Sequence, residues 1–406
     1  MSIQCVTMNR FVETALRAFV LACLLASAPA YSAQRTFVST SGVNNPACSP
    51  VAPCRDFASA IAATSSGGEV IVLDSGGYGL VTITKAVSII APPGLYAGIS
   101  VFAAQTGITI NAGASDRVVL RGLTISGLGS DTGVIINSGG QIYIEDCTLT
   151  GFTFVGINVN GGGSTHVSGL VSRQNFLGVF VNSDGTAVHV SDSRLALGAT
   201  GLALQAGNLD ANRVTIEDTF VGGIRAFPVS AGTVSLALVD VVVRRSTSIG
   251  VQLVVPVGTA ATLNAVMSRV AISNSASNPG IQVDSSDAGT VTVAIADSTI
   301  AENTEGITAV GADTTVILSN SMRTSIHRHS GPEAWYLVAG TQCLETPEGI
   351  TVAHAGDSAV VPEGPAMRLS SVGAETRRSV LLVLHDTSQS WMTVASDWTP
   401  KDLCPK

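Results

Sequence analysis

The stretch "GVIINSGGQIYIEDCTLTGFTFVGINV", residues 133–159, contains one full period of a repeat. It opens and closes on the same phrase: a glycine, an aliphatic residue, any residue, and then an aliphatic or small one. The phrase occurs nine times, at spacings of 22 to 30 residues, and begins at Gly107, Gly133, Gly156, Gly178, Gly201, Gly223, Gly250, Gly280 and Gly306. Self-similarity at such a period is typical of a solenoid, whose stacked coils share one continuous core.

Between the phrases lie further short segments that alternate apolar and polar residues, such as "TVTVAIADSTI" at 290–300. Three short strands per coil with no helical stretch predict an all-β parallel β-helix rather than a leucine-rich repeat, whose Leu/Asn framework is missing. Apolar residues would face inward, and Gly or Asn would serve the bends that need a positive φ. Because the period is 22 or 23 residues there, we expect Gly133, Gly156, Gly178 and Gly201 to stack at one corner.

The segment 31–320 resembles the right-handed parallel β-helix proteins of the pectate-lyase-like superfamily. The resemblance is one of architecture and repeat style, and it is not specific to any enzyme of that group. Ahead of the repeat, "CRDFASAIAATSSGG" at 54–68 places Phe57, Ala60 and Ile61 at helical spacing. A short helix here would cap the N-terminal end of the solenoid, which otherwise exposes strand edges.

Charge and targeting signals narrow the class of protein. Charged residues make up 12% of the 406 residues, and the net charge is −8 with no Lys/Arg cluster. This balance argues against nucleic acid as a partner. Residues 1–30 read as a signal peptide, because Arg10 and Arg17 precede the apolar run "AFVLACLLASAPA". We therefore expect a secreted or periplasmic protein, and the run is too short to leave an integral membrane segment in the mature chain.

Five cysteines remain after removal of that segment. In an oxidising compartment, Cys48 and Cys54 are close enough in sequence to form a small disulfide loop. Cys343 and Cys404 form a second candidate pair, which leaves Cys147 as a buried thiol. The alternative is that all five serve as small apolar residues.

At about residue 321 the glycine phrase stops and the composition changes, since all three tryptophans lie beyond it. His327 and His329 are two residues apart, so in a strand their side chains would share a face. Gly331 and Pro332 predict a turn that returns Glu333 beside them. Two imidazoles and a carboxylate predict a site for a divalent metal ion such as Zn, Mn or Fe.

The stretch "HRHSGPEAWYLVAG", residues 327–340, fits the first motif of the cupin superfamily, and "GDSAVVPEGPAM", residues 356–367, fits the second. The resemblance implies a small antiparallel β-barrel over 321–406 with His327, His329 and Glu333 as metal ligands. Met367 stands where cupins have a fourth ligand, a histidine. The strands that should precede the first motif are replaced by solenoid sequence, so the barrel is expected to be truncated at its N-terminal side. A fusion of two genes would explain this arrangement.

Other histidines of the tail are candidates for the missing ligand. His385 is expected on a late strand and is our candidate for a fourth nitrogen, whereas His354 is a weaker substitute. The alternative is that the motif is relict and the barrel holds side chains only.

The solenoid carries few signs of chemistry. Its acidic residues fall mostly one per coil, at Asp116, Asp146, Asp192, Asp218, Asp240 and Asp297. No paired Asp-Asp motif appears, although hydrolases of this fold pair carboxylates as acid and base. His166 and His189 are one coil apart and are expected to stack. Arg225 and the pair Arg244–Arg245 would either bind an acidic sugar or lie in solvent.

Three functions remain open at this point. The first is a non-catalytic binding or structural scaffold with a metal-competent tail, whose partner is a carbohydrate or a small molecule. The second is a metal-dependent cupin enzyme carried on a solenoid. The third is a polysaccharide lyase or hydrolase that uses the solenoid face. The sequence alone does not decide whether the protein is an enzyme.

Overall fold

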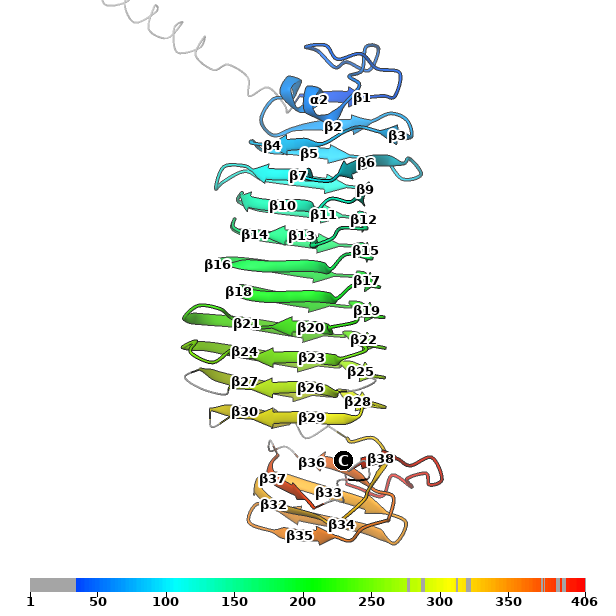
Figure 1. The fold of residues 1–406 in the computed structure, drawn as a ribbon, viewed down its shortest axis with the longest axis vertical. Coiled ribbons are helices and arrows are strands. Elements are labelled where there is room, and N and C mark those ends of the chain that lie inside the picture. Colours follow the sequence, from blue (N-terminus) through cyan, green and yellow to red (C-terminus); the bar gives the residue numbers. More distant parts are fainter. Residues whose placement is uncertain are drawn as a thin grey trace, which may run out of the picture.

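The computed structural model describes residues 34–405, except 276–277, 286–288, 312, 319–322, 374, 376, 385–387 and 389–391. The predicted signal peptide and His385 lie outside the described residues. Figure 1 shows a long stack of strands that ends on a smaller group of strands. Over the described ranges the chain is all-β apart from one helix of seven residues, α2 (Phe57–Ala63). No helix of this part is long and apolar enough to cross a membrane.

Most coils of the solenoid contribute one strand to each of three columns, and the strands of successive coils pair in parallel. The first column contains β4 (Val81–Ile83), β7 (Thr106–Asn111), β10 (Thr132–Ser138), β13 (Val155–Val159), β20 (Gly222–Ala226), β23 (Ile249–Val254), β26 (Pro279–Asp284) and β29 (Glu305–Val310). The second contains β1 (Arg35–Val38), β2 (Gly68–Val72), β5 (Val87–Ile90), β8 (Arg117–Arg121), β11 (Gln141–Glu145), β14 (Ser164–Ser168), β21 (Gly232–Val239), β24 (Ala261–Ser268), β27 (Thr290–Ala296) and β30 (Thr314–Leu318).

Two long strands, β16 (Leu177–Ser191) and β18 (Thr200–Asn212), run through both of these columns and join them into one 20-stranded sheet. The third column is a separate 10-stranded sheet. It contains β3 (Gly76–Gly77), β6 (Ala97–Phe102), β9 (Leu123–Leu128), β12 (Thr148–Thr150), β15 (Val171–Arg173), β17 (Arg194–Ala196), β19 (Thr215–Glu217), β22 (Val242–Arg244), β25 (Ala271–Ser273) and β28 (Thr299–Ala301).

The core runs along the axis of the solenoid as one cluster from Val38 to Ile300. Because the strands pair in parallel and in register, equivalent residues of successive coils lie above one another. One inward position is occupied in turn by Val118, Ile142, Thr165 and Val188. All four side chains are buried. A single coil cannot bury this face, so each coil is stabilised by its neighbours.

The glycine stack predicted from the sequence is confirmed. The register pairs Thr132 with Val155 and Val134 with Ile157, which aligns Gly133 with Gly156. A Cβ built on Gly133, Gly156 or Gly178 would lie 2.5–2.8 Å from the carbonyl oxygen of the next glycine of the stack. These glycines are therefore required by the close approach of the next coil, and none of them has a positive φ.

Residues other than glycine also make the bends. Gly122, Gly151 and Gly169 have positive φ, as predicted, but Asp146, Asp192, Asp218, Asp240 and Asp297 take the same conformation with φ of 50–56°. Asp tolerates the left-handed region better than most residues. The near-regular occurrence of one acidic residue per coil therefore has a structural cause.

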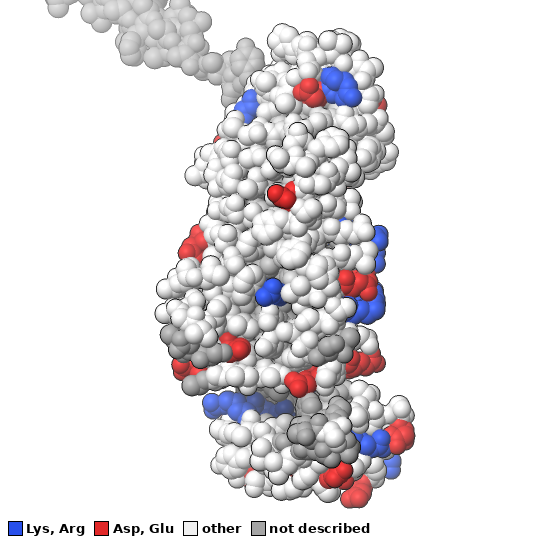
Figure 2. All heavy atoms as spheres, viewed as in Figure 1, with Lys and Arg blue, Asp and Glu red and all other residues white. Residues whose placement is uncertain are grey.

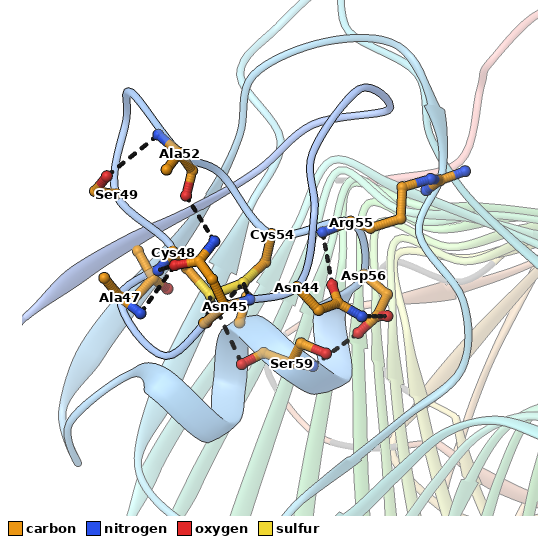
Figure 3. Close-up of a disulfide and its surroundings, with 12 residues drawn as sticks. Asn44, Asn45, Ala47, Cys48, Ser49, Ala52, Cys54, Arg55, Asp56 and Ser59 are labelled. Carbon is orange, nitrogen blue, oxygen red and sulfur yellow. Dashed lines mark hydrogen bonds between the residues drawn. A yellow bond between two sulfur atoms is a disulfide. The ribbon is translucent and has the colours of Figure 1, made fainter.

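The predicted N-terminal helix is present as α2, with Phe57, Ala60 and Ile61 buried against the first coil. Asp56 caps the helix, since its carboxylate accepts a hydrogen bond of 2.8 Å from the backbone N–H of Ser59. Figure 3 shows the predicted disulfide between Cys48 and Cys54 beside this helix.

Around that disulfide, the Asn45 carboxamide stabilises the loop. It accepts from the backbone N–H of Cys48 at 2.8 Å and donates to the carbonyl of Ala52 at 2.9 Å. The second disulfide, between Cys343 and Cys404, is also present, and Cys147 is a buried free thiol, as predicted. Burial raises the pKa of Cys147 to about 12, which makes it a poor nucleophile.

The tail follows the last coil and forms three small antiparallel sheets in the described residues. They are β31 (His327–His329) with β38 (Met392–Val394); β35 (Ser358–Val361), β32 (Glu333–Ala339) and β37 (Arg378–Val383); and β34 (Gly349–His354), β33 (Thr341–Thr346) and β36 (Arg368–Val372). Within the described residues these sheets are separate, so the truncated barrel that the cupin resemblance implies is not confirmed. The structure thus supports antiparallel packing in the tail without confirming a barrel.

Candidate metal centre

The first two candidate ligands lie on one short strand. β31 alternates buried, half-buried and buried residues, so His327 and His329 share its inner face as predicted. His327 is 6% exposed and His329 is 4% exposed. The strand is held from one side by β38, where His329 pairs with Met392. The two imidazole rings meet edge to face, with centroids 4.9 Å apart.

Glu333 comes from the start of β32, directly after the Gly331–Pro332 segment. It is 3% exposed, and its Oε2 lies 2.8 Å from Nε2 of His329. Ligand atoms of the three residues all lie within 4.8 Å of one another. In the described part of the chain this is the one group of three or more His, Cys, Asp or Glu residues that meets this spacing. The sequence-predicted ligands His327, His329 and Glu333 are therefore brought together.

The tautomer of His327 follows from its backbone contact. Its Nδ1 lies 2.7 Å from the carbonyl oxygen of Ser325, which can only accept, so Nδ1 carries the proton. Nε2 is then left with the lone pair that a metal ion needs. Burial lowers the pKa of His327, with a smaller lowering by His329, and this keeps the ring neutral. A neutral, oriented imidazole is the form that binds metal ions.

Met367 lies directly opposite His327. The two backbones exchange hydrogen bonds of 3.1 and 2.8 Å, and side chains at such opposed positions lie on one face of the pair. Met367 is 1% exposed and packs with Leu344, Val361 and Leu369. A thioether is a poor ligand for ions that suit imidazole and carboxylate, so Met367 fills space beside the three ligands.

The ligands line a cavity of about 450 Å³ between the last coil and the tail. Its walls come from β28, β29 and β30 on one side and from β31, β36 and β37 on the other. Such a volume suits a small-molecule ligand. The sequence did not predict this cavity, because it depends on how the tail packs under the solenoid.

Arg377 is a site residue that the sequence reasoning missed. It lines the cavity, is 7% exposed, and donates one hydrogen bond of 2.7 Å from Nη1 to Oε1 of Gln342. Burial lowers the pKa of Arg377 to about 10, while the charge of Glu333 acts to raise it. The adjacent pair Arg377–Arg378 in a chain otherwise poor in charge was the available signal.

His354 and His385 were the two candidates for a fourth metal ligand. His354 lies exposed at the end of β34, with Nδ1 3.2 Å from the Thr341 hydroxyl, and it is not part of the ligand group. His385 falls outside the described residues, so its role as a fourth ligand stays a prediction.

The outer face of the solenoid carries the predicted histidine stack. His166 and His189 are paired in register, with ring centroids 4.9 Å apart. Tyr143 stacks on His166 at 4.9 Å, and Asp210 lies 2.9 Å from Nδ1 of His189. The sequence predicted the histidine pair, and the structure extends it over neighbouring coils.

The three arginines that were candidates for binding an acidic sugar already have partners. Arg225 donates to Gln252 and lies over the ring of Phe227. Arg244 and Arg245 both pair with Glu217, and Arg245 also pairs with Asp218. These contacts favour a structural role over the binding of an acidic sugar.

Comparison with known proteins identifies the fold of the solenoid. No protein-family model and no curated protein matches the chain. Among solved structures, the chain is similar to pectate lyase Pel9A, with a TM-score of 0.51 and 12% identity over 70% of this chain and 79% of that one. The Dettilon tailspike protein gp208 gives a TM-score of 0.37 and 10% identity over 82% of this chain and 79% of that one.

Tailspike protein 2 from Escherichia coli O157:H7 bacteriophage CAB120 gives a TM-score of 0.38 and 9% identity over 89% of this chain and 69% of that one. At these identities the pectate lyase match shows the fold alone. The chain is an all-β protein built on a right-handed type of parallel β-solenoid.

Proposed function

We propose that this protein is a non-catalytic scaffold whose tail binds a divalent metal ion through His327, His329 and Glu333. One observation carries the proposal: three buried metal-ligating side chains have their ligand atoms within 4.8 Å of one another. A buried carboxylate with two imidazoles is costly unless its groups are paired or bind a metal ion.

The donor set selects the class of ion. Two imidazole nitrogens and one carboxylate oxygen suit Zn, Mn or Fe, with water or a further side chain completing the shell. Zn ligands at about 2.1 Å lie roughly 3.4 Å apart at tetrahedral angles. The ligand atoms of the three side chains lie within 4.8 Å of one another, which is close to that spacing. A bound ion would tie β31 to β32 and hold the wall of the cavity in place.

The sequence motifs support three further parts of this proposal. The segment 321–406 is an N-terminally truncated relative of the cupins, joined to a β-helix domain over 31–320. Residues 1–30 direct export, which fits the two disulfides of the described chain. Export to the periplasm or the medium is tested by locating the protein in cell fractions.

The metal proposal is tested by calorimetry on the exported full-length protein with Zn, Mn and Fe(II). We expect one site per chain in the parent, loss of binding in His327→Ala, and unchanged binding in the matched control His354→Ala. The control removes an exposed imidazole of the same tail. Equal affinities of the parent and His327→Ala would show that the motif is a relict.

A second candidate function is carbohydrate binding on the solenoid. The observation that favours it is a row of exposed phenyl rings: Phe154, Phe176 and Phe220 are 40%, 44% and 54% exposed. Backbone hydrogen bonds place them at one edge of nearby coils. The structural neighbour is named a pectate lyase, which makes acidic glycans the first ligands to examine.

This candidate is tested by glycan-array binding of the parent and of Phe176→Ala. Loss of binding in the variant would support a stacking surface, whereas absence of glycan binding by the parent would reject it. Incubation with pectate, followed by product analysis, decides whether the surface also cleaves its ligand.

A further inference from the structure

We propose that the cavity beside the metal ligands binds a small organic acid, whose carboxylate is received by the Arg377 guanidinium. The proposal deepens the metal-site function and rests on it for one of the two anchors of the ligand. The Arg377 guanidinium is a cation whose N–H groups do not all have hydrogen-bond acceptors among the described residues.

Arg377 is a buried cation of the cavity wall. No carboxylate of the described residues lies within ion-pair distance of it, and its Nε has no hydrogen-bond partner. Among the described residues, its hydrogen-bond partner is a neutral amide, that of Gln342. A buried cation in this state is costly, and a planar guanidinium is suited to receive a carboxylate through two parallel hydrogen bonds.

Metal binding would make the cavity more positively charged and therefore more favourable to a bound anion. Glu333 is the negative charge that acts on Arg377, and it is also one of the three metal ligands. A divalent ion bound at the site would neutralise the charge of Glu333 and leave the cavity with a net positive charge. Open positions on the ion and the free face of Arg377 then offer two anchors to one ligand.

The rest of the lining selects an organic acid over a free phosphate ion. Apolar side chains line both walls: Ile307, Val316 and Leu318 from the last coil, and Leu369, Leu381 and Met392 from the tail. Glu302 and Glu305 line the solenoid wall and disfavour a densely charged anion. Figure 2 shows a blue band of Lys and Arg atoms and red acidic atoms where the solenoid meets the tail.

The test uses glutarate as the probe and inorganic phosphate as the competing anion, on the full-length protein with and without Zn. Glutarate is expected to bind both forms, and more tightly with Zn. In Arg377→Gln its affinity should fall about 10- to 100-fold, the usual worth of a charged hydrogen-bond pair. Arg269→Gln, which removes the same charge from the outer surface of the solenoid, should leave the affinity unchanged.

Arg377→Lys keeps the charge but cannot donate two parallel hydrogen bonds to one carboxylate, so it should weaken glutarate binding by a smaller factor. This variant replaces Arg377→Gln in the test if Arg377→Gln does not fold. Unchanged glutarate affinity in a folded Arg377 variant, or phosphate binding as tight as glutarate binding, would overturn the proposal. Absence of Zn binding would instead reject the metal site, and the Zn-free arm would still decide the role of Arg377.

Discussion

At the scale of single residues, the position of Met367 beside the three proposed ligands should decide how tightly the proposed site would hold a metal ion. Met367 lies opposite His327 and faces the same cavity. Met367→His should raise Zn affinity by about 10- to 100-fold, because an added imidazole replaces bound water. Met367→Leu conserves the apolar volume without a ligand and should leave the affinity near that of the parent. Calorimetry on the three proteins measures both, and equal affinity of the two variants would contradict the geometry.

A second prediction concerns the histidine stack on the solenoid. Burial lowers the pKa of His166, and the neighbouring His189 lowers it further. In His189→Gln the second cause disappears, so the pKa of His166 should rise while it stays below the ordinary value near 6.5. NMR titration of the His166 ring in both proteins measures this shift. A pKa that does not move would show that the two rings are not electrostatically coupled.

At the scale of one coil, the glycine stack sets how closely the strands can pack. A Cβ on Gly178 would lie 2.5 Å from the carbonyl oxygen of Gly201, whereas a Cβ on Gly306 meets nothing within 4 Å. Gly178→Ala should therefore lower the free energy of unfolding by about 2 kcal/mol or more. Gly306→Ala, at the same position of the last phrase, should change it by less than about 0.5 kcal/mol. Denaturant unfolding of both variants checks the difference, and equal losses would contradict the stacking argument.

The coil was predictable because its causes are local and repeated. Gly133 and Gly156 recur at the coil period since each lies against the next, and that requirement is visible as spacing. His327 and His329 were predictable for a similar reason, because strand alternation fixes their common face. The bends were predicted only in part, since Asp146 and Asp192 adopt a conformation that we had assigned to Gly or Asn.

What the sequence could not predict depends on contacts between distant segments. Arg377 lines the site because β37 lies beside the last coil, where Leu318 and Arg377 form an isolated bridge. The truncated barrel that two motifs led us to expect is not confirmed, because motif spacing reports on local turns and not on how strands assemble into a barrel. The described tail strands form three separate small sheets.

At the scale of the whole molecule, the two ends of the solenoid differ in how they are covered. At the N-terminal end α2 and the Cys48–Cys54 loop lie over the first coil. At the other end, β29 and β30 present their open edges to the tail. Ile307 and Leu318 of this coil are only partly buried, although they pack on the core. The tail therefore acts as a C-terminal cap that shields unpaired backbone groups and apolar side chains.

A chain that ends at residue 320 should consequently self-associate. Its last coil would expose strand edges that can pair with another copy, which is the usual consequence of an uncovered edge. The N-terminal end stays covered in that chain, so association should stop at dimers joined through their last coils rather than continue into filaments. Sedimentation of the truncated and full-length chains at equal concentration measures the difference. The same association state in both would mean that the tail is dispensable as a cap.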